Sequence, residues 1–240
     1  MKLLMNNMGK LSKVIGIISY LPDNEEIRQH RFNLVINLVL KCQSLFKLPI
    51  MIIAQNWPPE LFKDAEENGE LIIYRYDHGL TIVGARKELR KKFLESNYDY
   101  LIMLDDDCEL EGEDASEYLN QIDQNPGCWI EFTSSLLKLF AISKEAFKLV
   151  DYDDVSLERR EGYEDWVFYE KLKAVCPVLR RRFHNTGINQ HSNSTADPYS
   201  TWYQNKTVDL KDLLDKTATV CYKYNPNFCI FGVKVDKKEE

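Results

Sequence analysis

Short, continuous apolar runs alternate along this chain with longer segments in which apolar residues recur every three or four positions. The short runs are rich in β-branched residues, which is typical of buried strands. Four of them stand in the first half of the chain: VIGIISY at 14–20, IMIIA at 50–54, LIIYRY at 71–76 and DYLIML at 99–104. The segments 25–47 and 84–96 carry the helical spacing. This alternation predicts an α/β fold with a mostly parallel sheet and helices on both faces.

The second half of the chain continues the pattern less regularly. Further elements are expected in this order: strands at 128–133 and 137–142, helices at 143–150 and 164–175, a polar loop at 184–207, and a short helix and a strand at CIFGVKV near the end. We find no internal repeat or low-complexity linker. The chain is therefore expected to form one domain over 12–207, with a C-terminal extension over 208–240 that packs on it.

Composition narrows the classes of partner and compartment. The 240 residues are 44% hydrophobic and 29% charged, which excludes a disordered chain, and the net charge of −7 excludes a general nucleic-acid surface. The six cysteines form no C-x-x-C pair, so reduced thiols are expected. No signal peptide and no apolar run of about 20 residues is seen. A cytoplasmic protein is expected, with peripheral association at the inner face of the membrane left open.

Three adjacent carboxylates, Asp105, Asp106 and Asp107, directly follow the buried strand at 99–104. Adjacent carboxylates repel one another unless they are solvated or bound to a cation. Ligands in parallel α/β sheets sit at the carboxyl ends of the strands, and Mg²⁺ or Mn²⁺ there bridges carboxylates to phosphates. The motif therefore predicts a metal site, and a solvated acidic loop is the alternative.

The segment DHGLTIVGAR at 77–86 leads into the second helix, with two glycines around a short loop and Arg86 in the first turn. A helix N-terminus favours phosphate, and an arginine there adds a positive charge. A plain turn followed by a solvated arginine is the alternative.

Taken together, the stretch GARKELRKKFLESNYDYLIMLDDD and the IISY strand resemble the GT-A glycosyltransferases, especially the large family-2-like group, over about 14–191. The resemblance implies a Rossmann-like GT-A fold whose DxD motif reads Asp105-Asp106-Asp107. It assigns the nucleotide to Ser19, Tyr20, Gln55, Asn56, Arg86, Asp105 and Asp106. Many relatives have an acidic residue after the second strand to read the base, whereas this chain has the amides of Gln55 and Asn56.

The same resemblance assigns the metal and the catalytic base. Mn²⁺ or Mg²⁺ would be held by Asp105, Asp107 and His191, with His184 as the rival histidine. Asp165 matches the general base of inverting members, which removes the proton of the acceptor hydroxyl. Acids that complement a helix N-terminus are the alternative for this position. The residues expected to contact substrate are Glu164, Trp166, Tyr199 and Trp202.

The resemblance thus implies a metal-dependent, inverting hexosyltransferase that moves a sugar from a UDP-sugar to a glycan, lipid-linked or protein-linked acceptor, as in polysaccharide biosynthesis. Two alternatives stay open. A sugar nucleotidyltransferase shares a related fold but usually carries a glycine-rich signature after the first strand, where this chain has ISYLPDNEE. A non-catalytic glycan-binding domain of GT-A type is the other.

Overall fold

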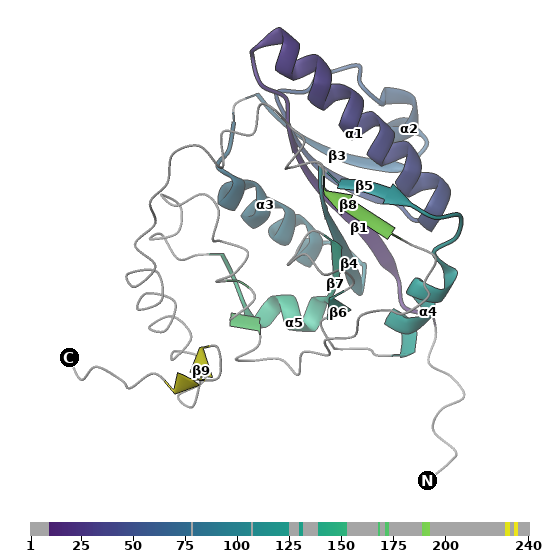
Figure 1. The fold of residues 1–240 in the computed structure, drawn as a ribbon, viewed down its shortest axis with the longest axis vertical. Coiled ribbons are helices and arrows are strands. Elements are labelled where there is room, and N and C mark those ends of the chain that lie inside the picture. The colour runs from purple at the N-terminus through teal and green to yellow at the C-terminus, as the bar shows by residue number, and fades with distance from the viewer. Residues whose placement is uncertain are drawn as a thin grey trace, which may run out of the picture.

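The structure is a computed structural model of the whole chain. It describes residues 10–77, 79–106, 108–124, 130–131, 139–152, 168, 171–172, 189–192, 229–230 and 233–234, and of 130–131 and everything from 189 onward it describes the backbone alone. Figure 1 shows the described elements as coloured ribbon.

The strands and helices alternate through the first half of the chain, as the apolar pattern predicts. In chain order the elements are β1 (Lys13–Tyr20), α1 (Glu25–Phe46), β2 (Ile50–Gln55), α2 (Lys63–Glu67), β3 (Leu71–Tyr76), α3 (Ile82–Glu95), β4 (Tyr100–Asp105), β5 (Cys108–Glu111), α4 (Ser116–Gln124), β6 (Ile130–Glu131), β7 (Leu139–Ser143), α5 (Lys144–Leu149), β8 (Asn189–Ser192), β9 (Cys229–Ile230) and β10 (Val233–Lys234).

Six strands form the central sheet in the order β3-β2-β1-β4-β7-β6. The first four run parallel, while β7 is antiparallel to β4 and β6 is antiparallel to β7. β5 and β8 pair with each other in a separate antiparallel ribbon, and β9 pairs with β10. The predicted α/β fold with a mostly parallel sheet is therefore confirmed.

Helices cover both faces of the sheet, so successive strand residues enter two different cores. In β2, Ile50 and Ile52 pack on the side of α1, and Met51 and Ile53 pack on the side of α3. Figure 1 shows α1 and α2 on one side of the sheet and α3 and α5 on the other. Continuous apolar runs are required for strands buried on both faces, which is why these strands lack a polar alternation.

Capping and close packing position α3 against the sheet. The helix begins two residues before the predicted start, because the Thr81 side chain accepts a hydrogen bond from the Gly84 amide at 3.0 Å and caps it. A Cβ atom on Gly16 of β1 would lie 2.7 Å from a Leu101 methyl and 3.1 Å from a Leu89 methyl. A larger residue at this position would force these two leucine side chains to shift, so glycine favours the close approach of α3 to the sheet. Arg86 of this helix contacts Asp105 at the end of β4.

Several elements differ from the sequence prediction. α2, β5 and α4 lie in stretches for which we predicted no element, and β8 lies inside the predicted polar loop at 184–207. β8 is polar because it pairs in a two-stranded ribbon outside the main sheet, where an apolar run is not needed. Within the predicted helix 164–175, the three described residues are helical. Among the described residues no helix is long and apolar enough to cross a membrane.

Two cysteines have described side chains. Cys42 and Cys108 are both buried, and the expectation of reduced thiols for the six cysteines stays a prediction. Burial raises the pKa of the Cys42 thiol well above its ordinary value, so this side chain behaves as an inert apolar group of the core.

Candidate functional site

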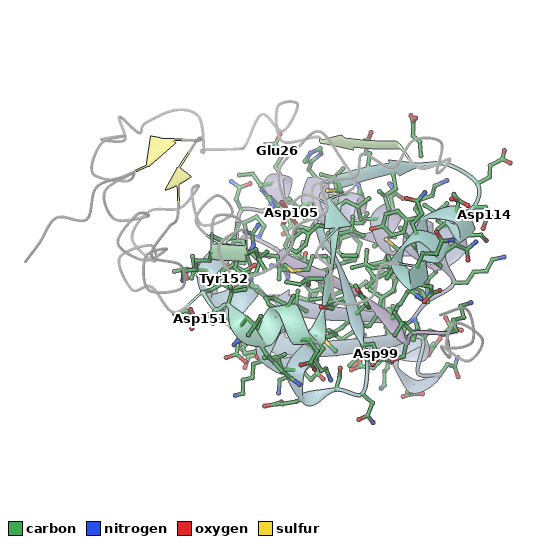
Figure 2. All side chains as sticks on the ribbon, turned by 90° about the horizontal axis from the view of Figure 1, so that it is seen from below. Glu26, Asp99, Asp105, Asp114, Asp151 and Tyr152 are labelled. Atoms are coloured by element: carbon green, nitrogen blue, oxygen red, sulfur yellow. The ribbon has the colours of Figure 1, made fainter. Side chains whose placement is uncertain are left out.

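The parallel strands end together at one edge of the sheet. The register pairs Tyr20 of β1 with Gln55 of β2, and Gln55 with Tyr76 of β3, while Ile18 of β1 pairs with Asp105 of β4. Figure 2 shows Asp105 at this edge and Asp99, which precedes β4, at the opposite end. The predicted residues of three separate segments are therefore brought to the edge where ligands of parallel α/β sheets bind.

Asp105, the first carboxylate of the motif, is paired with a buried arginine. Arg86 of α3 is only 2% exposed, and its Nη2 atom lies 3.2 Å from Asp105 Oδ1. A buried guanidinium requires such a partner, because an uncompensated charge in the core is costly. Arg86 thus fixes the orientation of Asp105. Its predicted role beside the nucleotide stays a prediction.

Asp106, the second carboxylate, connects β4 to β1 and α1. Its Oδ2 atom accepts a hydrogen bond from the Tyr20 amide at 3.4 Å, and its Oδ1 atom lies 3.6 Å from Arg31 Nη1. Sequence reasoning missed Arg31. The available signal was its spacing of three residues from Arg28, which places both arginines on one face of the predicted helix at 25–47.

The amides predicted to read the base are engaged with the protein itself. Gln55 is buried, and its Oε1 atom accepts a short hydrogen bond from the Leu80 amide in the loop before α3. Asn56 has a positive φ of 57°, and its side-chain nitrogen donates to the Leu21 carbonyl at 2.9 Å and to Asp23 at 2.8 Å. Both side chains therefore brace loops at this edge, and direct base contact by either one stays a prediction.

The end of β1 presents one buried and one exposed side chain. Ser19 is buried, and its hydroxyl accepts a hydrogen bond from the Trp57 indole nitrogen at 3.2 Å. Tyr20 is 38% exposed, and a Cβ atom on Gly79 would lie 3.4 Å from its ring. Of the two predicted base contacts, the Tyr20 ring is the one that this edge presents to solvent.

Tyr76, at the end of β3, adds a hydroxyl to this edge. It donates to Glu88 of α3 at 2.9 Å. Burial, followed by this hydrogen bond and the nearby Glu88 charge, raises the pKa of Tyr76 to about 12. The hydroxyl therefore stays protonated near neutral pH and does not serve as a general base.

The β5–β8 ribbon brings a distant segment to the acidic motif. The backbone of His191 pairs with that of Glu109, which follows Asp107 by two residues. Among the side chains that the structure describes, no three His, Cys, Asp or Glu residues gather as a metal-binding group. The side chains of Asp107 and His191 lie outside that description. The metal assignment to Asp105, Asp107 and His191 therefore stays a prediction, and its oxygen and imidazole donors suit Mn²⁺ or Mg²⁺.

The remaining predicted site residues lie outside the described part of the chain. These are the base candidate and its acidic neighbour, the aromatic residues of the acceptor side, and the rival histidine: Asp165, Glu164, Trp166, Tyr199, Trp202 and His184. The boundary between 12–207 and 208–240 likewise falls among residues that the structure does not describe.

This chain resembles known proteins in its fold rather than in its sequence. No family model matches the sequence, and no curated protein matches it. A putative glucose-1-phosphate thymidylyltransferase from Bacillus anthracis is similar in structure, with a TM-score of 0.53 and 10% identity over 89% of this chain and 97% of that one. This likeness shows a shared fold.

Two other solved structures match a smaller part of their own length. TarS from S. aureus is 9% identical, with a TM-score of 0.47 over 68% of this chain and 34% of that one. GalNAc-T7 in complex with UDP, GalNAc and Mn²⁺ is 15% identical, with a TM-score of 0.46 over 69% of this chain and 41% of that one. The chain thus spans less than half of either protein.

The strand order and the likeness to the Bacillus anthracis structure show the fold. The chain has a mixed α/β fold with a mostly parallel sheet, and the GT-A-like fold expected from its sequence is confirmed.

Proposed function

We propose that this chain is a glycosyltransferase that takes a hexosyl group from a nucleotide-sugar, with a UDP-sugar as the donor to test first. The observation that carries the proposal is the pair of carboxylates at the carboxyl end of β4. Asp105 is held by buried Arg86, and Asp106 is held by the Tyr20 amide of β1 and by Arg31 of α1. A fixed acidic group at this edge of a parallel sheet suits a phosphate donor that arrives with a divalent cation.

The metal belongs to the same proposal. Asp105, Asp107 and His191 are the residues that would hold Mn²⁺ or Mg²⁺, and the β5–β8 pairing supports this set because it brings the His191 backbone beside the motif. When bound, such a cation neutralises charge on the departing nucleoside diphosphate.

The transfer step is proposed to proceed with inversion at the anomeric carbon. Asp165 accepts the proton of an acceptor hydroxyl while that oxygen forms its bond to the anomeric carbon. The bond between this carbon and the phosphate oxygen breaks, and the nucleoside diphosphate leaves with the electron pair. Glu164 would hold sugar hydroxyls, and Trp166, Tyr199 and Trp202 would offer ring faces to the sugars. A glycan, lipid-linked or protein acceptor at the cytoplasmic face of the membrane is part of this proposal.

A panel of nucleotide-sugars tests the proposal. We expect one donor to release its nucleoside diphosphate only when Mn²⁺ or Mg²⁺ is added, and we expect Asp107→Ala to abolish this release and the metal-dependent donor binding. Glu113→Ala, at an exposed acid of the same region, is the matched control and should keep both. Full turnover of Asp107→Ala in metal-depleted buffer would sink the metal assignment.

A sugar nucleotidyltransferase is the second candidate, because the Bacillus anthracis structure that shares the fold is described as a putative member of that class. The loop after β1 disfavours this candidate, because nucleotidyltransferases usually carry a glycine-rich signature there. The loop Leu21-Pro22-Asp23-Asn24 has no glycine, and Asn56 donates hydrogen bonds to it. Pyrophosphate release from a nucleoside triphosphate and a sugar 1-phosphate would favour this candidate. Glycan binding without any nucleotide affinity would favour a non-catalytic domain.

A further inference from the structure

One arginine of α1 connects the two loops that follow β1 and β2. Arg28 Nη2 donates to the carbonyl of Asn56 at 2.7 Å, and Arg28 Nη1 donates to the carbonyl of Pro22 at 3.3 Å. The side chain is partly buried, and α1 is anchored beside it because Asn24 caps the helix through the Ile27 amide at 3.1 Å. A planar guanidinium holds two carbonyls at once in a way that a lysine ammonium on a flexible stem does not.

The backbone of Asn56 is shaped to meet this arginine. Its φ of 57° lies in the left-handed region, which asparagine tolerates better than most residues. Its amide donates to the Tyr76 carbonyl at 2.9 Å, and its side chain donates to Leu21 and Asp23. Arg28 and Asn56 therefore form one network, which we call the loop clamp, that ties together the chain segments leaving β1, β2 and β3.

We infer that Arg28 is a positioning residue that sets the preference for the nucleobase, an inference that rests on the proposed function. The clamp fixes the segments 20–24 and 55–57; the first carries the exposed Tyr20 ring, and the backbone of Tyr20 pairs with that of Gln55 in the second. The side chains of Gln55 and Asn56 form hydrogen bonds with the protein itself. The base preference is therefore expected to depend on how firmly the two segments are held as well as on which amides they contain.

The clamp is separate from the charged groups that would meet the diphosphate. The Arg86–Asp105 pair lies on α3 and β4, and none of the clamp contacts described above involves it. Disturbing Arg28 should therefore affect recognition of the base and spare recognition of the phosphates. A substitution that only destabilised the fold would weaken both equally.

The experiment compares Arg28→Lys with Arg75→Lys. Arg75 is a matched control because its guanidinium also holds a backbone carbonyl, that of Leu61 at 3.0 Å, together with Glu66 of α2 at 2.7 Å, and these side-chain contacts are not part of the clamp. Asn56→Gly is a second variant, since glycine keeps the left-handed backbone and removes the side-chain hydrogen bonds. Calorimetry with UDP, GDP, CDP and inorganic pyrophosphate, and thermal denaturation of each protein, give the readouts.

We expect Arg28→Lys and Asn56→Gly to lower the affinity for the preferred nucleoside diphosphate by about tenfold. The ratio of this affinity to the affinities for the other two nucleoside diphosphates should fall by a similar factor. The affinity for pyrophosphate should stay within about twofold of the wild-type value. Arg75→Lys should lower thermal stability and keep the base preference. An unchanged preference in both clamp variants would overturn this inference alone. A wild-type protein that binds no nucleoside diphosphate would overturn the proposed function along with it.

Discussion

The two ends of the central sheet carry acidic residues in very different settings. At the amino end, Lys13 of β1 is 1% exposed and its ammonium lies 2.6 Å from Asp123 of α4. Asp99, just before β4, accepts hydrogen bonds from the Ser12 hydroxyl at 2.7 Å and from the Ser12 amide at 2.8 Å. These short contacts join β1 to α4 and to the segment before β4. They give both carboxylates a structural role.

At the carboxyl end the corresponding contacts are longer and involve arginine. Asp105 lies 3.2 Å from Arg86, and Asp106 lies 3.6 Å from Arg31. The first distance is at the upper end of ordinary hydrogen bonds, and the second is beyond it. Such pairs hold the carboxylates in place at the carboxyl end of the sheet. The contacts at the amino end join strands and helices of the fold, and those at the carboxyl end hold acidic residues at the edge where ligands of parallel α/β sheets bind. Substitutions at the two ends should separate stability from function.

The largest effect is expected from Asp165, the proposed base on the functional side of this comparison. Asp165→Asn keeps the shape of the side chain and removes its proton affinity, so sugar transfer should fall by ~10²–10⁴-fold. Donor affinity and thermal stability should change little. Steady-state transfer rates, with NMR of the product, make the test. Wild-type rates in the variant, or retention of the anomeric configuration, would show that Asp165 is only an acid at a helix start.

At the amino end, Asp123→Ala should act on stability instead. The change leaves the buried Lys13 ammonium without its carboxylate, and because Asp123 is partly exposed we expect the free energy of unfolding to fall by about 2–3 kcal/mol. Denaturant titration measures this, and Gln124→Ala at the exposed end of α4 is the control. Nucleotide affinity should be preserved below the unfolding transition. A loss of affinity in the folded variant would contradict the division between the two ends.

Arg86 is a buried residue at the carboxyl end of the sheet, so its substitution tests whether a buried charge at this end affects ligand binding. Arg86→Lys keeps the charge but not the geometry toward Asp105, so the affinities for UDP and for pyrophosphate should both fall, by about tenfold. Arg90→Lys is the control on the same helix, since Arg90 donates to the Phe147 carbonyl at 3.0 Å. If calorimetry shows that Arg86→Lys binds pyrophosphate as the wild type does, Arg86 has no role toward the phosphates.

The positions of the six strands of the central sheet and of the acidic motif could be predicted from the sequence. A continuous apolar run that ends in Asp105-Asp106 is a local pattern, and parallel topology then places its end at the ligand edge. The predicted start of the second helix at residue 84 lies two residues after the start of α3 at Ile82, because Gly84 and Arg86 mark the first turns of the helix. These features depend on patterns that a single segment displays by itself, which are a short continuous apolar run for a buried strand and a period of 3.6 residues for a helix.

The partners of those residues could not be predicted in the same way. Arg28 and Arg31 appear in the sequence as ordinary polar positions of a helix, and only the packing of α1 against β1 and β2 directs them to Asn56 and Asp106. The left-handed backbone of Asn56 is likewise set by neighbours distant in sequence. β8 was missed because a polar strand outside the main sheet has the composition of a loop.

The smallest effect on the free energy of unfolding is expected at Asp99. The pH dependence of this effect shows whether the Asp99 carboxylate stabilises the fold through its charge. The hydrogen bonds from the Ser12 hydroxyl and amide, helped by the charges of Lys144 and Lys13, hold the pKa of Asp99 below its ordinary value of 3.8. A lowered folded-state pKa means that the ionised form stabilises the fold above the ordinary value, and that this contribution disappears as the pH falls through the folded-state pKa.

Asp99→Asn should therefore lower the free energy of unfolding by less than about 1 kcal/mol at neutral pH, since the site is largely exposed. The difference from the wild type should stay constant down to about pH 4 and shrink below it. Denaturant titrations between neutral and acidic pH measure the difference, and NMR titration of Ser12→Ala should show the pKa of Asp99 moving back toward 3.8. A difference that persists undiminished at the lowest pH would mean that Asp99 stabilises the strand end by shape rather than by charge.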